Sequence, residues 1–133
     1  MASIRFGILV YPYQALDVIG PLDVLSGSNA SILKAYEDWD LIPKDVHKRC
    51  LELDGQYDMR QLPPSDYLLL GGPMPDYKLP EEMITFIKGR VASGEIKTVF
   101  TTCTGSMVLA QTGLLDGKRA AVNHSAYPMA ERF

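Results

Sequence analysis

Short aliphatic runs alternate along this chain with segments of helical pattern, and this alternation limits the possible folds more than any other feature. The first run ends at Pro12 and the second at Gly71. Runs of this length that are rich in aliphatic residues indicate buried strands. Strands are therefore predicted at residues 5–11, 67–70, 97–101 and 119–122.

Helices are predicted between and after these strands, at residues 16–25, 80–91, 105–111 and 125–133. The second of them is the clearest, because a proline and two glutamates open it and four apolar side chains share one face. Proline is favoured in the first turn of a helix, so Pro21 predicts that the first helix starts close to Gly20.

The remaining stretch, residues 28–62, fits no single pattern. Residues 32–36 could continue a helix, 39–42 could form a short strand, and 44–53 could form either. The rest of the chain still decides the fold class. Strands that alternate with helices imply an α/β fold, with a mainly parallel sheet and helices on both faces. Ligands of such sheets bind at the carboxyl ends of the strands.

Composition narrows the classes of function. A chain of 133 residues is expected to form one domain, residues 1–133. Its formal net charge of −3 argues against a nucleic-acid partner, and the one basic cluster, at residues 44–49, is expected to be a solvated face. No apolar run approaches the roughly 18 residues of a membrane span, and the N-terminus lacks the pattern of a secretory signal.

The two cysteines, Cys50 and Cys103, are expected to be thiols in a reducing compartment, so a cytoplasmic location is predicted. Together with His47 and His124 they have no spacing typical of metal ligands. Neither a metal nor an organic cofactor is predicted, since no phosphate-binding glycine loop is present either.

The segment around Cys103 carries the most specific chemical signal. A predicted strand runs directly into a predicted helix, and the cysteine lies at the junction, with Gly105 two residues later. This pattern predicts a nucleophile elbow, in which a tight turn exposes the side chain and the helix N-terminus favours the thiolate. The alternative is a small buried hydrophobic residue, as most free cysteines are.

Three further positions follow strands and so belong to the same sheet edge. The backbone N–H of Gly72, with that of Thr104, could form an oxyanion hole, or Gly72 could serve a tight turn that needs a positive φ. Asp17 could cap a helix or be a partly buried acid that exchanges protons. His124 could approach the sulfur or cap the following helix.

Several motifs in the same order resemble the ThiJ/PfpI superfamily, whose fold is class I glutamine amidotransferase-like and flavodoxin-like. They are Phe6-Gly-Ile-Leu-Val-Tyr-Pro, Leu16-Asp-Val-Ile-Gly-Pro-Leu-Asp-Val-Leu, Asp66-Tyr-Leu-Leu-Leu-Gly-Gly, Cys103-Thr-Gly and Leu109-Ala-Gln-Thr-Gly-Leu-Leu-Asp-Gly-Lys. The resemblance spans residues 4–127 and is weak between about residues 28 and 62. Within the superfamily, Cys-Thr-Gly-Ser with the upstream Leu-Asp-Val-Ile-Gly-Pro is most similar to the isonitrile hydratase branch.

This resemblance implies hydration of an isonitrile to an N-substituted formamide, with Cys103 as nucleophile, Asp17 as general acid and base, and Gly72 and Thr104 as backbone donors. The proteolytic and glyoxalase branches usually place histidine where this chain has Thr104. Glyoxalase or deglycase chemistry on reactive carbonyls remains the first alternative. A cysteine redox or ligand sensor, as in the related domains of AraC-type regulators, is the second.

Family members usually continue for several tens of residues past the position of Phe133. The resemblance therefore implies that the C-terminal part of the domain is lacking here. We expect the chain to be less stable than a longer version, and to form a homodimer or to associate with the missing segment. The expected partner in the site is a small-molecule substrate.

Overall fold

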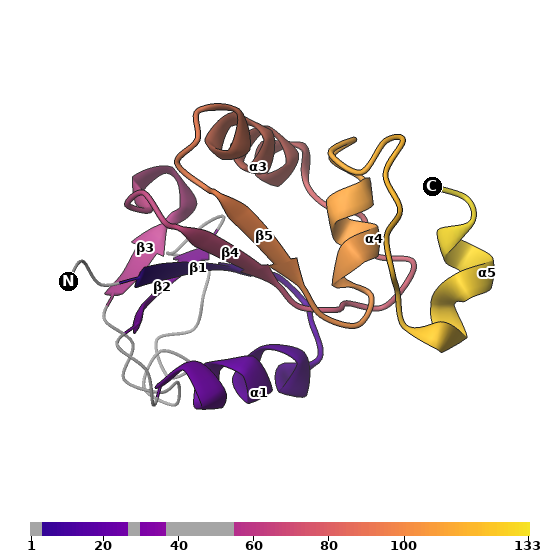
Figure 1. The fold of residues 1–133 in the computed structure, drawn as a ribbon, viewed down its shortest axis with the longest axis horizontal. Helices are drawn as coiled ribbons and strands as arrows, with labels where there is room; N and C mark the ends of the chain where they lie inside the picture. The colour runs from indigo at the N-terminus through magenta and orange to yellow at the C-terminus, as the bar shows by residue number, and fades with distance from the viewer. Residues whose placement is uncertain (1–3, 27–29, 37–54) are drawn as a thin grey trace.

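The computed structural model describes residues 4–26, 30–36 and 55–133 (Figure 1). Its centre is a five-stranded sheet in the order β3-β2-β1-β4-β5, in which every neighbouring pair is parallel. The strands are β1 Ile4–Val10, β2 Ala30–Tyr36, β3 Gly55–Asp58, β4 Tyr67–Leu70 and β5 Thr98–Thr101. After β1 the chain adds β2 and β3 on one side of β1, and it then adds β4 and β5 on the other side. The order of the strands therefore reverses between β1 and β4.

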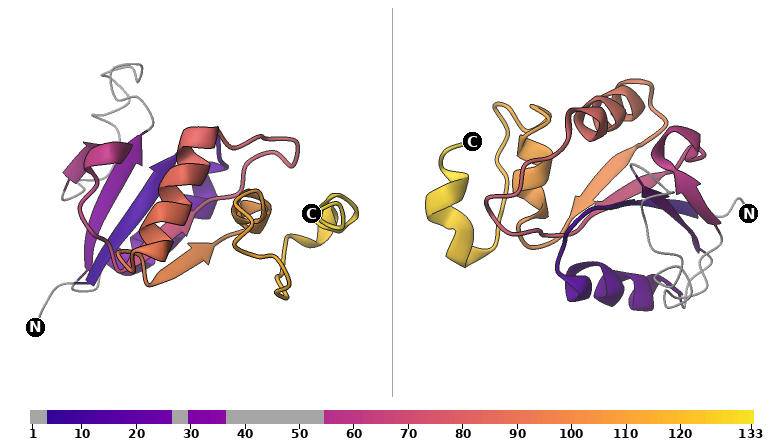
Figure 2. Two further views of the ribbon diagram at one scale, coloured as in Figure 1. Left: turned by 90° about the horizontal axis from the view of Figure 1, so that it is seen from above. Right: turned by 180° about the vertical axis from the view of Figure 1, so that it is seen from behind.

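Helices cover both faces of the sheet. The helix α1 (Ala15–Ser26) lies on one face, and α3 (Glu81–Ala92) lies on the opposite face (Figure 1). The short helices α4 (Gly105–Ala110) and α5 (Tyr127–Ala130) follow β5, and the views in Figure 2 place them at the end of the molecule away from β3. One-turn 3₁₀ helices occupy Met59–Gln61 and His124–Ala126.

The alternation of side chains along β4 explains why both faces need cover. Leu68 and Leu70 belong to the core under α3 and α4, while Leu69 packs with Val18 and Leu22 of α1. None of the three leucines is more than 1% exposed. Each such burial is worth about 2 kcal/mol, which is why an unbroken aliphatic run specifies a central strand of a covered sheet.

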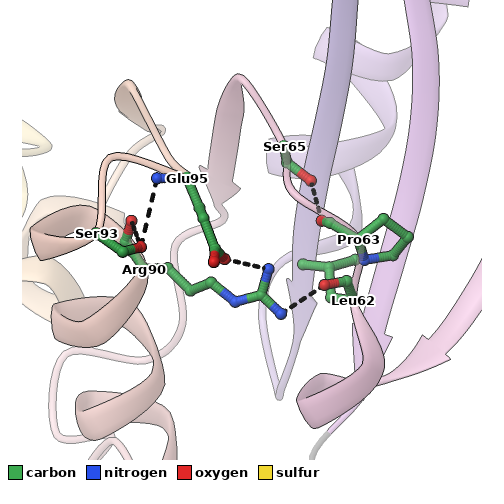
Figure 3. A network of polar contacts seen from close by, with 6 residues as sticks. All are labelled: Leu62, Pro63, Ser65, Arg90, Ser93 and Glu95. Atoms are coloured by element: carbon green, nitrogen blue, oxygen red, sulfur yellow. Dashed lines mark hydrogen bonds and ion pairs between the residues drawn. The ribbon is translucent and has the colours of Figure 1, made fainter.

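A polar network fastens α3 to the segment that leads into β4 (Figure 3). Arg90, near the end of α3, forms an ion pair with Glu95 at 2.7 Å and donates a hydrogen bond to the carbonyl of Leu62. Ser93 and Ser65 tie their own turns to nearby backbone carbonyls. Because Arg90 is mostly buried, this contact holds the helix at a definite position over the sheet.

The structure confirms the predicted α/β, flavodoxin-like fold with its parallel sheet and helices on both faces. The strand at 67–70 has the predicted bounds, and the strand and helices predicted at 97–101, 80–91 and 105–111 shift by one residue at most at either end. Residues 32–36, which could have continued a helix, belong to β2 instead. The alternatives considered for residues 39–42 and 44–53 lie outside the described residues.

Three predictions about secondary structure are wrong in whole or in part. The helix predicted at 16–25 is confirmed as α1 (Ala15–Ser26), but the start close to Gly20 that Pro21 predicted is wrong, because Pro21 lies inside the helix. Residues 119–122 form no strand. Residues 119–121 are exposed, and two alanines and a valine offer too little apolar surface to bury a strand there. Residues 125–133, predicted as one helix, contain the single turn of α5 preceded by a 3₁₀ turn.

None of the helices in the described part of the chain is both long enough and apolar enough to span a membrane.

Candidate active site

The turn between β5 and α4 holds Cys103 in a strained conformation. Its φ of 52° is the only positive φ of a non-glycine residue in the described part of the chain. Such a conformation costs on the order of 1–2 kcal/mol and persists only where the surroundings enforce it. The turn is closed by a hydrogen bond from the Gly105 N–H to the Thr102 carbonyl at 2.7 Å. The Cys103 side chain is partly exposed, as a reacting thiol must be.

Gly105 permits the close approach that the elbow requires. A Cβ at this position would collide with the backbone carbonyl oxygen of Leu70 at the end of β4. A glycine at position 105 therefore lets the two backbone segments pass closely. The elbow is thereby pressed against the end of the neighbouring strand.

The turn after β4, Gly71-Gly72-Pro73, is fastened at each of its three carbonyl groups. Tyr11 Oη donates to the Gly71 carbonyl at 2.7 Å, the Gln14 N–H donates to that of Gly72 at 2.9 Å, and Thr104 Oγ1 donates to that of Pro73 at 2.6 Å. Burial, reinforced by Tyr77, Tyr13 and Asp17, raises the pKa of Tyr11 far above its ordinary value. Tyr11 therefore keeps its proton and remains a donor.

Position 72 requires a glycine because a side chain would not fit there, and not because its backbone has a positive φ. Neither it nor Gly71 is among the described residues with positive φ, so the expectation of a turn that requires one is wrong. A Cβ on Gly72 would lie 2.6 Å from Asp17 Oδ2 and 2.7 Å from the Thr104 nitrogen. The acid and the residue that follows Cys103 therefore converge on this one position.

Asp17 lies in the first turn of α1, where its carboxylate accepts a hydrogen bond from the Gly72 N–H at 3.1 Å. The carboxylate is directed to the Gly72 backbone, and no hydrogen bond joins it to the Cys103 sulfur in the described part of the chain. Asp17 does not cap α1 from outside, since the helix begins two residues earlier. The structure thus places Asp17 at the edge of the elbow, close to the backbone of Thr104.

The two backbone N–H groups expected to form the oxyanion hole differ in whether they already donate a hydrogen bond. The N–H of Gly72 is engaged by Asp17. The N–H of Thr104 has no acceptor within the described part of the chain. Thr104 therefore carries the backbone donor that remains open next to the sulfur.

The residue that touches the sulfur is Asn123, which the sequence reasoning did not single out. Its Nδ2 donates to Cys103 Sγ at 3.3 Å, and its backbone N–H donates to the Cys103 carbonyl at 3.3 Å. Its Oδ1 accepts from the N–H and hydroxyl of Ser125, which fixes the orientation of the amide. The sequence did indicate a place for Asn123 near the site. It directly follows residues 119–122, whose predicted strand was expected to end at this edge of the sheet.

His124 is exposed and its ring contacts Tyr127, with the ring centres 5.2 Å apart. Two roles were considered for His124, approach to the sulfur and capping of the next helix. Asn123 contacts the sulfur and caps the 3₁₀ turn at His124–Ala126, and the residue that precedes α5 is Ala126. Cys50 and the basic cluster at 44–49 lie outside the described residues. Among those that are described, no group of three or more histidine, cysteine or acidic residues could hold a metal ion.

Asn123→Ala is expected to slow alkylation of Cys103 by iodoacetamide at pH 7 by about tenfold, since a hydrogen bond to a charged acceptor is worth about 1.5 kcal/mol or more. The amide donor stabilises the thiolate, which is the reacting form. His124→Ala is the neighbouring comparison and should leave the rate within about twofold. A slow His124→Ala protein beside a normal Asn123→Ala protein would assign the sulfur contact to the histidine instead. The rate is measured by mass spectrometry of the Cys103 peptide.

The assembled site lies where parallel α/β sheets bind ligands. Asp17 follows β1 and Gly72 follows β4, the pair of strands at which the strand order reverses, and Cys103 follows the adjacent β5. Figure 1 shows the ends of these three strands facing the start of α1 and of α4.

The chain is similar to isonitrile hydratase from Pseudomonas putida, with 32% identity over an alignment of 129 positions that covers 94% of this chain and 54% of the relative. It therefore spans about half the length of the curated relative that it matches. No family model matches the chain. The similarity confirms the resemblance of this chain to the ThiJ/PfpI superfamily and, within it, to the isonitrile hydratase branch.

Proposed function

We propose that this chain takes part in the hydration of an isonitrile to an N-substituted formamide, with Cys103 as the nucleophile and Asp17 as the general acid and base. The observation that carries the proposal is the convergence at Gly72, where the Asp17 carboxylate and the backbone of Thr104 lie within contact distance of one point next to the elbow. The similarity to isonitrile hydratase supports the choice of substrate class.

The chemistry follows from the two functional groups. The Cys103 thiolate attacks the terminal carbon of R–N≡C, and that carbon takes a proton from the acid, which gives the thioimidate R–N=CH–S–Cys. Water then adds across the C=N bond: its oxygen bonds to the carbon, and Asp17 accepts one of its protons and passes it to the nitrogen, which gives R–NH–CH(OH)–S–Cys. Asp17 then accepts the hydroxyl proton as the C=O bond forms and the C–S bond breaks, so the thiolate and the acid are both regenerated and R–NH–CHO leaves. One isonitrile and one water thus become one formamide.

Each neighbouring residue has a defined part in this scheme. Asn123 donates to the sulfur and so favours the thiolate before attack and after its departure. The open N–H of Thr104 is available to the oxygen that water adds at the tetrahedral stage. The clamped Gly71-Gly72-Pro73 turn keeps the Asp17 carboxylate in place through the cycle, since its donors need no reorganisation.

The test uses an alkyl isonitrile and, in parallel, methylglyoxal, with the products followed by NMR. We expect formamide from the wild-type chain and none from Cys103→Ala. Consumption of methylglyoxal without formamide would favour glyoxalase or deglycase chemistry. If neither substrate turned over and Cys103 were readily oxidised to a sulfenic acid by peroxide, the site would be a sensor instead.

Asp17→Asn is expected to lower isonitrile turnover by about 10²-fold or more, because the amide keeps the shape of the side chain but cannot exchange a proton. Asp23→Asn, an exposed carboxylate on the same helix, is the matched control and should stay within about twofold of wild type. Initial rates of formamide formation are the measurement. Equal rates for the Asp17→Asn and wild-type proteins would remove Asp17 from the mechanism.

A further inference from the structure

The helix that carries Asp17 contains a proline that leaves one of its carbonyl groups without a helical donor. In an α-helix each N–H binds the carbonyl four residues earlier, and proline has no N–H. Pro21 lies inside α1, so it cannot donate to the carbonyl of Asp17. That carbonyl accepts a hydrogen bond from Thr102 Oγ1 instead, at 2.9 Å and across 85 positions of sequence.

Thr102 is the residue directly before Cys103, and its own backbone is fixed. Its N–H donates to the Leu70 carbonyl at 3.1 Å, and its carbonyl accepts from the Gly105 N–H at 2.7 Å. Its hydroxyl also lies 3.4 Å from the Leu70 carbonyl, but a single O–H favours the shorter contact with Asp17. The side chain is therefore a rigid link between the elbow and the first turn of α1.

We propose that Thr102 is a positioning residue that holds Asp17 at the elbow through the carbonyl that Pro21 leaves open. Asp17 is then held twice, by its carboxylate at the Gly72 N–H and by its carbonyl at Thr102. The first contact orients the side chain, and the second fixes the backbone from which that side chain extends. Displacement of a catalytic group by about 1 Å can cost about 10²-fold in rate, so both contacts matter.

Pro21 gives the link its specificity. With an alanine at position 21 the helix could supply an N–H to the Asp17 carbonyl, and α1 would no longer depend on Thr102 to satisfy it. Loss of the Thr102 hydroxyl should therefore be severe with Pro21 present and mild with Pro21→Ala. This dependence is not expected of a threonine that merely fills space.

The positioning role of Thr102 rests on the proposed hydration, but the first experiment that tests the role does not measure turnover. Amide hydrogen exchange of Gly72, followed by NMR, reports whether the Asp17 carboxylate still accepts from that N–H. Thr102→Val keeps the shape and removes the hydroxyl, and it should speed exchange at Gly72 by roughly fivefold or more. Thr102→Ser keeps the hydroxyl and should stay near wild type, and Pro21→Ala with Thr102→Val should recover most of the loss.

The second measurement is turnover of an alkyl isonitrile. Thr102→Val should lower kcat by roughly tenfold or more with little change in KM, and should add little in an Asp17→Asn background, since it acts through Asp17. Unchanged Gly72 exchange in Thr102→Val, or equal loss in the Thr102→Ser protein, would overturn the positioning role. Faster Gly72 exchange in a protein whose wild type has no isonitrile turnover would support the link and overturn the proposed reaction.

Discussion

Cys103→Ser should reduce isonitrile turnover by roughly 10⁴-fold or more, the scale of loss found when a catalytic nucleophile is removed. A serine hydroxyl is a far weaker nucleophile than a thiolate unless a base ionises it. The side chain that contacts position 103 is Asn123, which offers only a donor and no base. Formamide formation under saturating isonitrile is the measurement.

The serine variant should keep its fold, which separates loss of chemistry from loss of structure. Both side chains are non-glycine residues at the same positive φ, so the strain of the elbow is carried over unchanged. Its melting temperature should remain within a few degrees of wild type, on the order of 1 kcal/mol. Turnover that persisted in Cys103→Ser, or labelling by limiting iodoacetamide that favoured Cys50 over Cys103, would contradict the central role of this thiol.

Gly105→Ala should destabilise the fold by about 3 kcal/mol or more, the upper part of the range for forced overpacking. The added Cβ would collide with the carbonyl oxygen of Leu70, which is backbone and cannot rotate away. Either β4 or the start of α4 must move, and both carry the site. A fall in the melting temperature of roughly 10 °C is expected, measured by circular dichroism.

Gly89→Ala is the matched control, with an effect of opposite sign. Gly89 lies inside α3, is exposed, and has no atom within 4 Å of its Cβ position. Alanine there should stabilise the protein by about 0.5–1 kcal/mol, the difference in helix propensity. If the two glycine variants changed the melting temperature equally, the close approach at Gly105 would not be what holds the elbow.

The sequence by itself determined the strands β1, β4 and β5 and most of the helices, but not β2 and β3, which lie in the stretch 28–62 that fitted no single pattern. Unbroken aliphatic runs such as 67–70 can only be buried between two covering layers, and the helix at 81–92 is specified by its own apolar stripe and acidic start. The sequence also predicted the elbow, with Cys103 at the junction of strand and helix and Gly105 two residues later. It could do so because a strand-to-helix turn leaves few conformations for the residues within it.

Prediction from the sequence was wrong where the local preference of a segment differs from what tertiary packing imposes on it. Proline favours a helix start, so Pro21 pointed to Gly20, yet Thr102 from a distant strand end satisfies the carbonyl that the proline leaves open, and α1 begins at Ala15. The run at 119–122 looked like a strand but buries too little surface to act as one. Local signals do not encode what the rest of the chain will supply.

The contacts that make the site were decided by the tertiary structure. That Asp17 binds the Gly72 N–H, that Asn123 reaches the sulfur, and that Thr102 anchors α1 are facts about residues 55, 20 and 85 positions apart. A sequence lists the residues that follow each strand, and the parallel sheet brings those ends to one edge. Which side chain then contacts which is set by close packing at Gly72 and Gly105, where a single Cβ would not fit.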